Sequence, residues 1–193
     1  PYVYGGAIYY AEEEIARLLH AWHDWARNQP ESVNTSVAIL RLPPDLPEPL
    51  GGSTVLHFRY AYVELGADAE SLLARGEAAL RSWRETAGPG LIDEVGLLPS
   101  DRIGEIHAEP EGPLPLWEWG DFLKPIDHDF VDRILEHAGA GIRTPLAVVE
   151  SQHADGGWGR ESQEPESAAW VSAFMGLMLI RGNVELKNPK IEQ

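Results

Sequence analysis

The apolar side chains in the first half of the chain follow two periods, one typical of strands and one of helices. Residues 1–10 (PYVYGGAIYY), 34–42 and 54–63 (TVLHFRYAYV) are rich in β-branched and aromatic residues, which predicts three strands. In 11–29 and 68–86 apolar residues return every three or four positions, which predicts two helices. The order β-α-β-β-α is that of a ferredoxin-like start. It predicts an α+β fold, a single antiparallel β-sheet with helices packed on one face.

The second half of the chain continues this pattern less regularly. Short segments are expected over 91–108, a strand near 117–124, and a third helix that Asp127 caps at its start. Two further apolar runs, 146–153 and 170–180, predict the last strands.

We expect residues 1–180 to form one domain. Residues 181–193 lose the pattern, which predicts either a disordered tail or a remnant of the expression vector. The apolar stripes of the three helices should pack on the sheet. The residues expected in that contact are Trp22, Trp25, Leu72, Leu73, Trp83, Ile134 and Leu135.

The second face of the sheet carries a different mixture of side chains. In the strand over 54–63, one face is wholly apolar or aromatic, whereas the other presents Val55, His57 and Arg59. In the later strand, Glu150 and Gln152 likewise follow apolar residues on one face. A mixture of apolar, ionisable and amide groups is more typical of a pocket wall than of a solvated sheet face.

Charge and composition exclude several classes of partner. The formal net charge is −16, so we expect no nucleic-acid partner and no anionic membrane surface. No cysteine is present, which excludes disulfides and thiolate nucleophiles and is compatible with a reducing compartment. No apolar run approaches the ~18–20 residues that span a bilayer. We therefore expect a cytoplasmic location.

Two motifs invite stronger interpretations than the sequence supports. The glycine pair Gly156-Gly157 is not followed by the lysine and hydroxyl residue of a phosphate loop, so it is either a turn or a close approach of the backbone to a flat ligand or partner domain. His20 and His23 share a helix face beside Asp24, but no third ligand follows at a typical spacing. A solvated helix surface is the preferred interpretation, and no metal site is predicted.

Glu150 stands out among the many acidic residues. It follows two valines in a strand of buried type, where a carboxylate is costly without a partner or a chemical task. One interpretation is a salt bridge, to Arg59 or Arg143, and the other is a functional carboxylate.

Several segments together resemble the substrate domain of FAD-linked oxidases of the berberine-bridge type. They are PYVYGGAIYY, AWHDWARNQPESVNTSVAILRLPP, TVLHFRYAYVE, IGEIHAEP and VVESQHADGG, and the resemblance covers about residues 1–180. It implies a large antiparallel sheet with helices on its back, whose open face covers the flavin ring and binds a small organic substrate. Gly156 and Gly157 would then turn close to the flavin-binding domain.

The resemblance also implies roles for individual residues. Glu150 would be the catalytic acid or base, and the substrate would be bound by His57, Arg59, Gln152 and His107. The glycine loop that holds the FAD diphosphate in this family is absent from the sequence. FAD is therefore expected in the full-length enzyme, held by a flavin-binding domain that this chain lacks, and no cofactor or metal is expected in this chain alone.

Two further functions remain open at this stage. The chain could be a non-catalytic small-molecule-binding protein that keeps the pocket without the cofactor. It could also be an interaction module whose open sheet face forms a homodimer, as a large exposed apolar face would favour.

Overall fold

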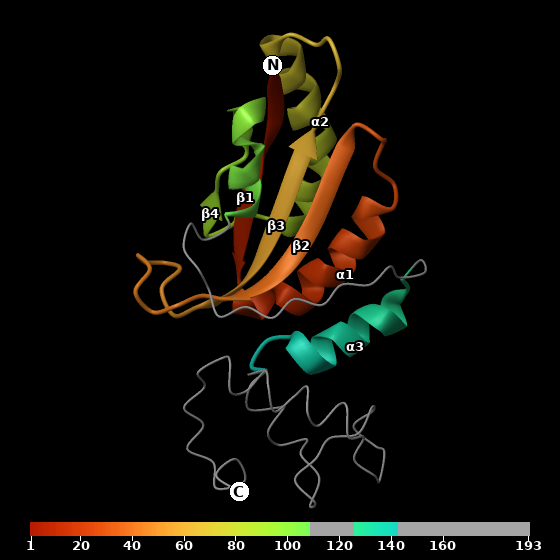
Figure 1. Cartoon of the computed structure of the whole chain (residues 1–193). Helices are drawn as coiled ribbons and strands as arrows, with labels where there is room; N and C mark the ends of the chain where they lie inside the picture. Colours follow the sequence, from red (N-terminus) through yellow and green to blue (C-terminus); the bar gives the residue numbers. More distant parts are fainter. Residues whose placement is uncertain (109–125, 143–193) are drawn as a thin grey trace, which may run out of the picture. The chain divides into compact units, whose positions relative to one another are not determined.

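The structure is a computed structural model that describes residues 1–108 and 126–142 (Figure 1). Apart from Ile142, these residues belong to one compact unit, formed by residues 1–109 and 125–141. In chain order the elements are β1 (Tyr2–Ala11), η1 (Glu12–Glu14), α1 (Ile15–Ala26), β2 (Val33–Arg41), β3 (Thr54–Tyr62), α2 (Ala69–Ala87), β4 (Ile92–Asp93), β5 (Gly96–Pro99), η2 (Ser100–His107) and α3 (His128–Ala138).

The described strands form one antiparallel sheet. Its order is β2-β3-β1-β4, and β5 pairs with β1 beyond β4 along the same strand. Phe58 of β3 lies opposite Ile8 of β1 and Val37 of β2, which fixes the register across the three long strands. This order and the β-α-β-β-α succession are those of a ferredoxin-like α+β fold, so the predicted fold class is confirmed.

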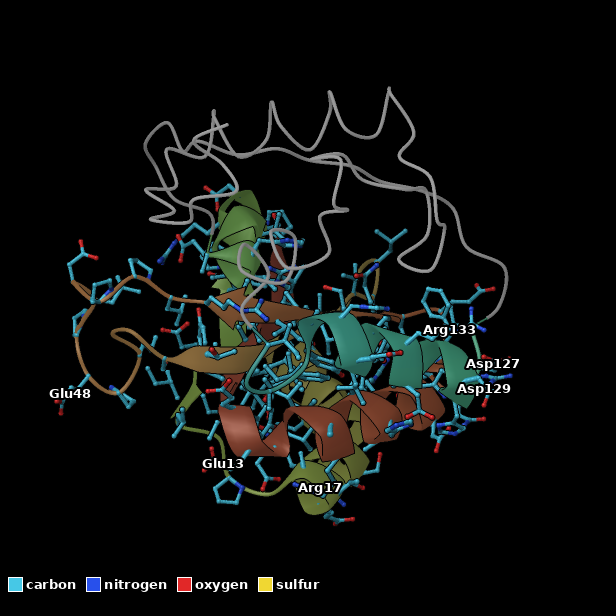
Figure 2. All side chains as sticks on the ribbon, turned by 90° about the horizontal axis from the view of Figure 1, so that it is seen from below. Glu13, Arg17, Glu48, Asp127, Asp129 and Arg133 are labelled. Atoms are coloured by element: carbon cyan, nitrogen blue, oxygen red, sulfur yellow. The ribbon has the colours of Figure 1, made fainter. Side chains whose placement is uncertain are left out.

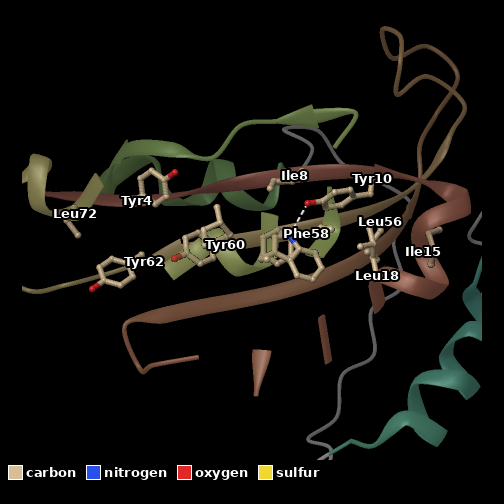
Figure 3. Close-up of a cluster of buried hydrophobic side chains, with 13 residues drawn as sticks. Tyr4, Ile8, Tyr10, Ile15, Leu18, Leu56, Phe58, Tyr60, Tyr62 and Leu72 are labelled. Carbon is tan, nitrogen blue, oxygen red and sulfur yellow. Dashed lines mark hydrogen bonds between the residues drawn. The ribbon is translucent and has the colours of Figure 1, made fainter. Parts of the chain in front are cut away.

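Both long helices cover the same face of the sheet. Alternate residues of β1 and β3, such as Ile8 and Phe58, are buried in one cluster with Leu18 of α1 and Leu72 of α2 (Figure 3). Side chains alternate between the two faces along a strand, so the apolar and aromatic residues at every second position of 54–63 all lie in this core.

Trp83 lies at the centre of this core. Its side chain is fully buried, and its ring stacks on that of Phe58 with centroids 4.5 Å apart. Nearby, Gly76 brings α2 close to the sheet, because a Cβ atom there would lie 2.3 Å from Cδ1 of Tyr4. The backbone carbonyl of Gly76 also accepts a hydrogen bond from the hydroxyl of Tyr60, at 3.1 Å.

One residue of the predicted helix–sheet contact was assigned to the wrong face. Leu73 is 46% exposed, whereas its neighbour Leu72 is 2% exposed. The two leucines are adjacent in sequence, so they point about 100° apart around a helix and only one of them can face the sheet. Trp22, Trp25 and Leu135 do pack against the core, and Ile134 is half-buried.

The helix starts follow the sequence closely. Asp68 caps α2 by accepting a hydrogen bond from the backbone N–H of Ser71, and Asp127 caps α3 in the same way through Phe130. Across residues 1–108 and 126–142, no helix is both long enough and apolar enough to cross a membrane. The strands predicted at 117–124, 146–153 and 170–180 and the tail at 181–193 lie outside the described residues.

Candidate pocket on the second face of the sheet

The second face of the sheet is not open, contrary to the sequence-based expectation. Most residues of β1 and β3 that point to it are buried, among them Ala7, Tyr9, Val55, His57 and Ala61. Ala7, Tyr9 and Val55 pack with Leu40, Leu42, Leu50 and Ile92 in a second apolar cluster. At the other end of β1, Ile106 of η2 lies over Gly5.

The chemistry of this face changes along the strands. Beside the apolar end, His57 lies between Tyr9 of β1 and Ala38 of β2, and one step further Arg59 lies between Ala7 and Ser36. The next row holds Gly5, Ala61 and Asn34. The side chains around Arg59 are therefore small, which leaves space beside its guanidinium group.

His57 is a buried and neutral donor. Its imidazole is fully buried and stacks on the ring of Tyr9, with centroids 4.4 Å apart. Burial, together with the positive charges of Arg59 and His107, lowers the pKa of His57 to about 4. Nδ1 accepts a hydrogen bond from Nε of Arg59 at 3.2 Å, so the proton of the neutral ring is on Nε2.

The Nε2–H group of His57 has no hydrogen-bond partner among the described residues. A buried donor without an acceptor costs about 1–3 kcal/mol, so such groups in native proteins usually call for an explanation. This donor is shielded from solvent, and His57 is not among the residues that line the pocket between the sheet and η2.

A pocket of about 320 Å³ opens between the sheet and η2. Its lining is mostly small or apolar, with two basic side chains. The lining residues are Asn34, Ser36, Arg59, Tyr60, Ala61, Val63, Ile103, Ile106 and His107. This volume is at the lower end of the range for small-molecule sites.

The structure thus brings three of the predicted substrate-binding residues together. Arg59 and His107 line the pocket, and His57 is hydrogen-bonded to Arg59 and within electrostatic reach of His107. The other predicted residues, Glu150, Gln152, Gly156 and Gly157, lie outside the described residues.

The described helix starts do not fit the diphosphate of FAD. Helix N-termini bind phosphates through free backbone N–H groups. Here Glu14, Asp68 and Asp127 stand at the starts of α1, α2 and α3, and the last two use their carboxylates to accept backbone N–H groups. Other acidic side chains, including Glu13 and Asp129, point outward near these ends (Figure 2). Negative charge at these positions repels a diphosphate.

The structure also shows a cluster that the sequence did not predict. His128 of α3 lies beside His20, His23 and Asp24 of α1, and His20 also contacts Asp132 of α3. His20 and His128 are 108 positions apart in the sequence. The spacing of potential ligands along the sequence therefore does not reveal the cluster. The available signal was the pair of helical motifs, His-x-x-His-Asp and His-x-x-x-Asp, each with its polar groups on one helix face.

The sequence matches no protein-family model and no curated protein.

Proposed function

We propose that this chain is the substrate-binding domain of a cytoplasmic flavin-dependent oxidoreductase whose FAD is held by a separate domain. The observation that carries the proposal is the meeting of His57, Arg59 and His107 on the second face of the sheet, beside a pocket of about 320 Å³. The family that the sequence resembles uses the corresponding face of its sheet for the substrate.

The pocket residues suit a small organic substrate with an anionic or hydrogen-bond-accepting group. Arg59 is permanently charged, and the hydrogen bond from its Nε to His57 restrains the orientation of its guanidinium group. His57 does not itself line the pocket but holds Arg59 in place by accepting its Nε–H. The apolar remainder of such a substrate would contact Val63, Ile103 and Ile106.

These residues bind and orient, and none of them is proposed to take a proton from the reacting carbon. FAD, when bound in its own domain, would accept the hydride. The proposed acid or base is Glu150, on the strand predicted over 146–153.

A non-catalytic small-molecule-binding protein is the second candidate. The observation that favours it is that the pocket is lined by residues of a single compact unit. A homodimer through an open apolar sheet face has less support, because the apolar second-face residues of β1 and β3, such as Tyr9 and Val55, are buried in the single chain.

Ligand binding can be tested on this chain. A panel of small carboxylates, phenols and neutral amides should be screened by ligand-observed NMR, and we expect carboxylates or phenols to bind. Arg59→Gln should weaken them at least about tenfold, since a hydrogen bond to a charged group contributes about 1.5–3 kcal/mol. Arg81→Gln, an exposed arginine of α2, is the matched control and should change nothing. Equal binding by both variants would exclude this pocket as the binding site.

A test of oxidoreductase activity requires protein expressed from the complete natural reading frame that contains this sequence. Protein expressed from that complete frame should show flavin absorbance, and a substrate found in the screen should reduce the flavin. Arg59→Gln and Glu150→Gln should each slow this reduction at least about tenfold, and Arg81→Gln should not. A product without flavin whose ligand binding still depends on Arg59 would instead support the non-catalytic binding protein.

A further inference from the structure

The histidine cluster between α1 and α3 forms a continuous chain of contacts. His23 Nε2 lies 2.8 Å from the backbone carbonyl of Ile126, and His23 Nδ1 lies 3.0 Å from Oδ1 of Asp24. The same Asp24 oxygen lies 2.9 Å from His128 Nε2. Further along this series of contacts, His128 Nδ1 lies 2.7 Å from His20 Nδ1, and His20 Nε2 lies 2.9 Å from Oδ1 of Asp132.

This series of contacts begins at the carbonyl of Ile126 and ends at the carboxylate of Asp132, and these two acceptors fix the tautomers of neutral histidines. A backbone carbonyl and a carboxylate can only accept, so His23 and His20 carry their protons on Nε2. Arg27, a donor, lies 3.4 Å from His23 Nε2, farther than the carbonyl of Ile126 at 2.8 Å, so the carbonyl contact decides the assignment. His20 Nδ1 is then an acceptor, and the proton in its contact with His128 must come from His128 Nδ1.

This assignment leaves three acceptors facing one another. With one proton on each imidazole, the lone pairs of His23 Nδ1 and His128 Nε2 both point at the carboxylate of Asp24. The contacts require either two additional protons or one divalent cation.

We infer that His23, Asp24 and His128 form a binding site for a divalent transition-metal ion of the zinc class. The three ligand atoms lie within 4.8 Å of one another. Ligands of a tetrahedral zinc ion, with bonds of ~2.0–2.1 Å, lie ~3.3 Å apart. The two short contacts to Asp24 would open by a few tenths of an ångström, and the two imidazole nitrogens, now within 4.8 Å of each other, would move to the same separation. Two imidazoles and one carboxylate leave a fourth position for water.

The groups behind the ligands match those of known zinc sites. Metal-ligating histidines usually donate their second ring N–H to a carbonyl, a carboxylate or another acceptor, which fixes the ring and the tautomer. Here His23 donates to Ile126, and His128 donates to His20, which in turn donates to Asp132. His23 is 2% exposed and therefore held firmly, whereas His128 and Asp24 are accessible to an incoming ion.

An ion at this site would fasten α3 to α1. α3 is otherwise held by the buried Val131, by Leu135 at the edge of the core and by polar bonds such as that from Arg41 to the carbonyl of Ala138. The ligands come from both helices, so binding should stabilise the docked position of α3.

Calorimetric titration with Zn²⁺ tests the site directly. The metal-free protein should bind one Zn²⁺ ion, and Co²⁺ in its place should give a visible absorption spectrum of a four-coordinate N/O site. Ca²⁺ and Mg²⁺ should not compete at equal concentration, because they prefer sites made wholly of oxygen ligands. His128→Ala and Asp24→Asn change exposed ligands and should each weaken Zn²⁺ binding at least about 100-fold while the fold is retained.

Two variants make the test specific. His137→Ala removes an exposed histidine from the last turn of the same helix and should leave binding unchanged. His20→Ala removes only the acceptor behind His128 and should cost about 10-fold, less than the loss of a ligand. Absence of one-to-one Zn²⁺ binding, or equal weakening by His137→Ala and His128→Ala in folded proteins, would overturn the inference.

Discussion

Trp83 donates its indole N–H to the hydroxyl of Tyr10 across 3.1 Å, within the core between α2 and the sheet (Figure 3). The bond allows a large aromatic residue to be buried without an unsatisfied donor. Burial raises the pKa of Tyr10 to about 12, although the Trp83 bond partly opposes this shift, so the hydroxyl stays protonated at neutral pH. The pair joins β1 to α2 independently of β3.

Truncation of Trp83 is therefore expected to be among the most damaging changes in the helix–sheet contact. Trp83→Ala should lower the free energy of unfolding by roughly 3–5 kcal/mol, because it removes a fully buried ring and its stacking on Phe58. Leu73→Ala, on the exposed side of the same helix, should cost less than about 1 kcal/mol. Urea titrations of both variants give the two numbers, and similar losses would contradict the assigned helix faces.

Local patterns predicted much of this fold. The cap Asp127 and the start of the second helix at Asp68 were predicted from the sequence, because a cap bonds a backbone N–H only three residues ahead. The buried set on β3 followed from strict alternation. The assignment of Leu73 was wrong because either of two adjacent leucines fits the helical period, and only the packed structure shows that Leu72 is the one that faces the sheet.

The candidate sites depended on contacts that no local pattern encodes. His57 and Arg59 were identified because they alternate within one strand, whereas their nearness to His107 depends on where η2 lies. The cluster around His128 was missed for a stronger reason. Its ligands combine two helices far apart in sequence, and His128 acquires chemical meaning only when α3 docks on α1.

The stability of the domain should fall in mild acid because of His57. Its pKa is about 4 in the folded protein against 6.5 for an unperturbed histidine, so the unfolded chain binds a proton between these values and the folded chain does not. The contribution is fully present above pH 6.5 and is lost as the pH falls toward 4, by up to about 3 kcal/mol at 1.36 kcal/mol per pKa unit.

Comparison with variants isolates this effect from other titrating groups. His57→Phe keeps a ring against Tyr9 but cannot bind a proton, so its stability should fall less steeply between pH 6.5 and 4 than that of the unchanged protein. His137→Gln, an exposed histidine, should keep the original slope. Chemical denaturation at several pH values measures the slopes, and identical slopes for all three proteins would show that His57 is solvated.

Gly76 tests how closely α2 approaches the sheet. In most helices an alanine in place of glycine stabilises by roughly 0.5–1 kcal/mol. Here the new Cβ would lie 2.3 Å from Cδ1 of the buried Tyr4 ring, and the carbonyl of Gly76 must also stay within reach of Tyr60. Gly76→Ala should therefore destabilise the domain by roughly 1–3 kcal/mol, as expected for an overpacked core.

A second substitution shows whether the Tyr4 ring causes that loss. Tyr4→Ala removes Cγ and Cδ1, the two atoms that the new methyl group would approach most closely, so Gly76→Ala should cost less in the Tyr4→Ala background than alone. The coupling energy from the four unfolding free energies should favour the double variant by roughly 1 kcal/mol or more, the range found for residues in contact. Strict additivity would mean that α2 relaxes away from the sheet. The close approach at Gly76 would then not be what holds the helix in place.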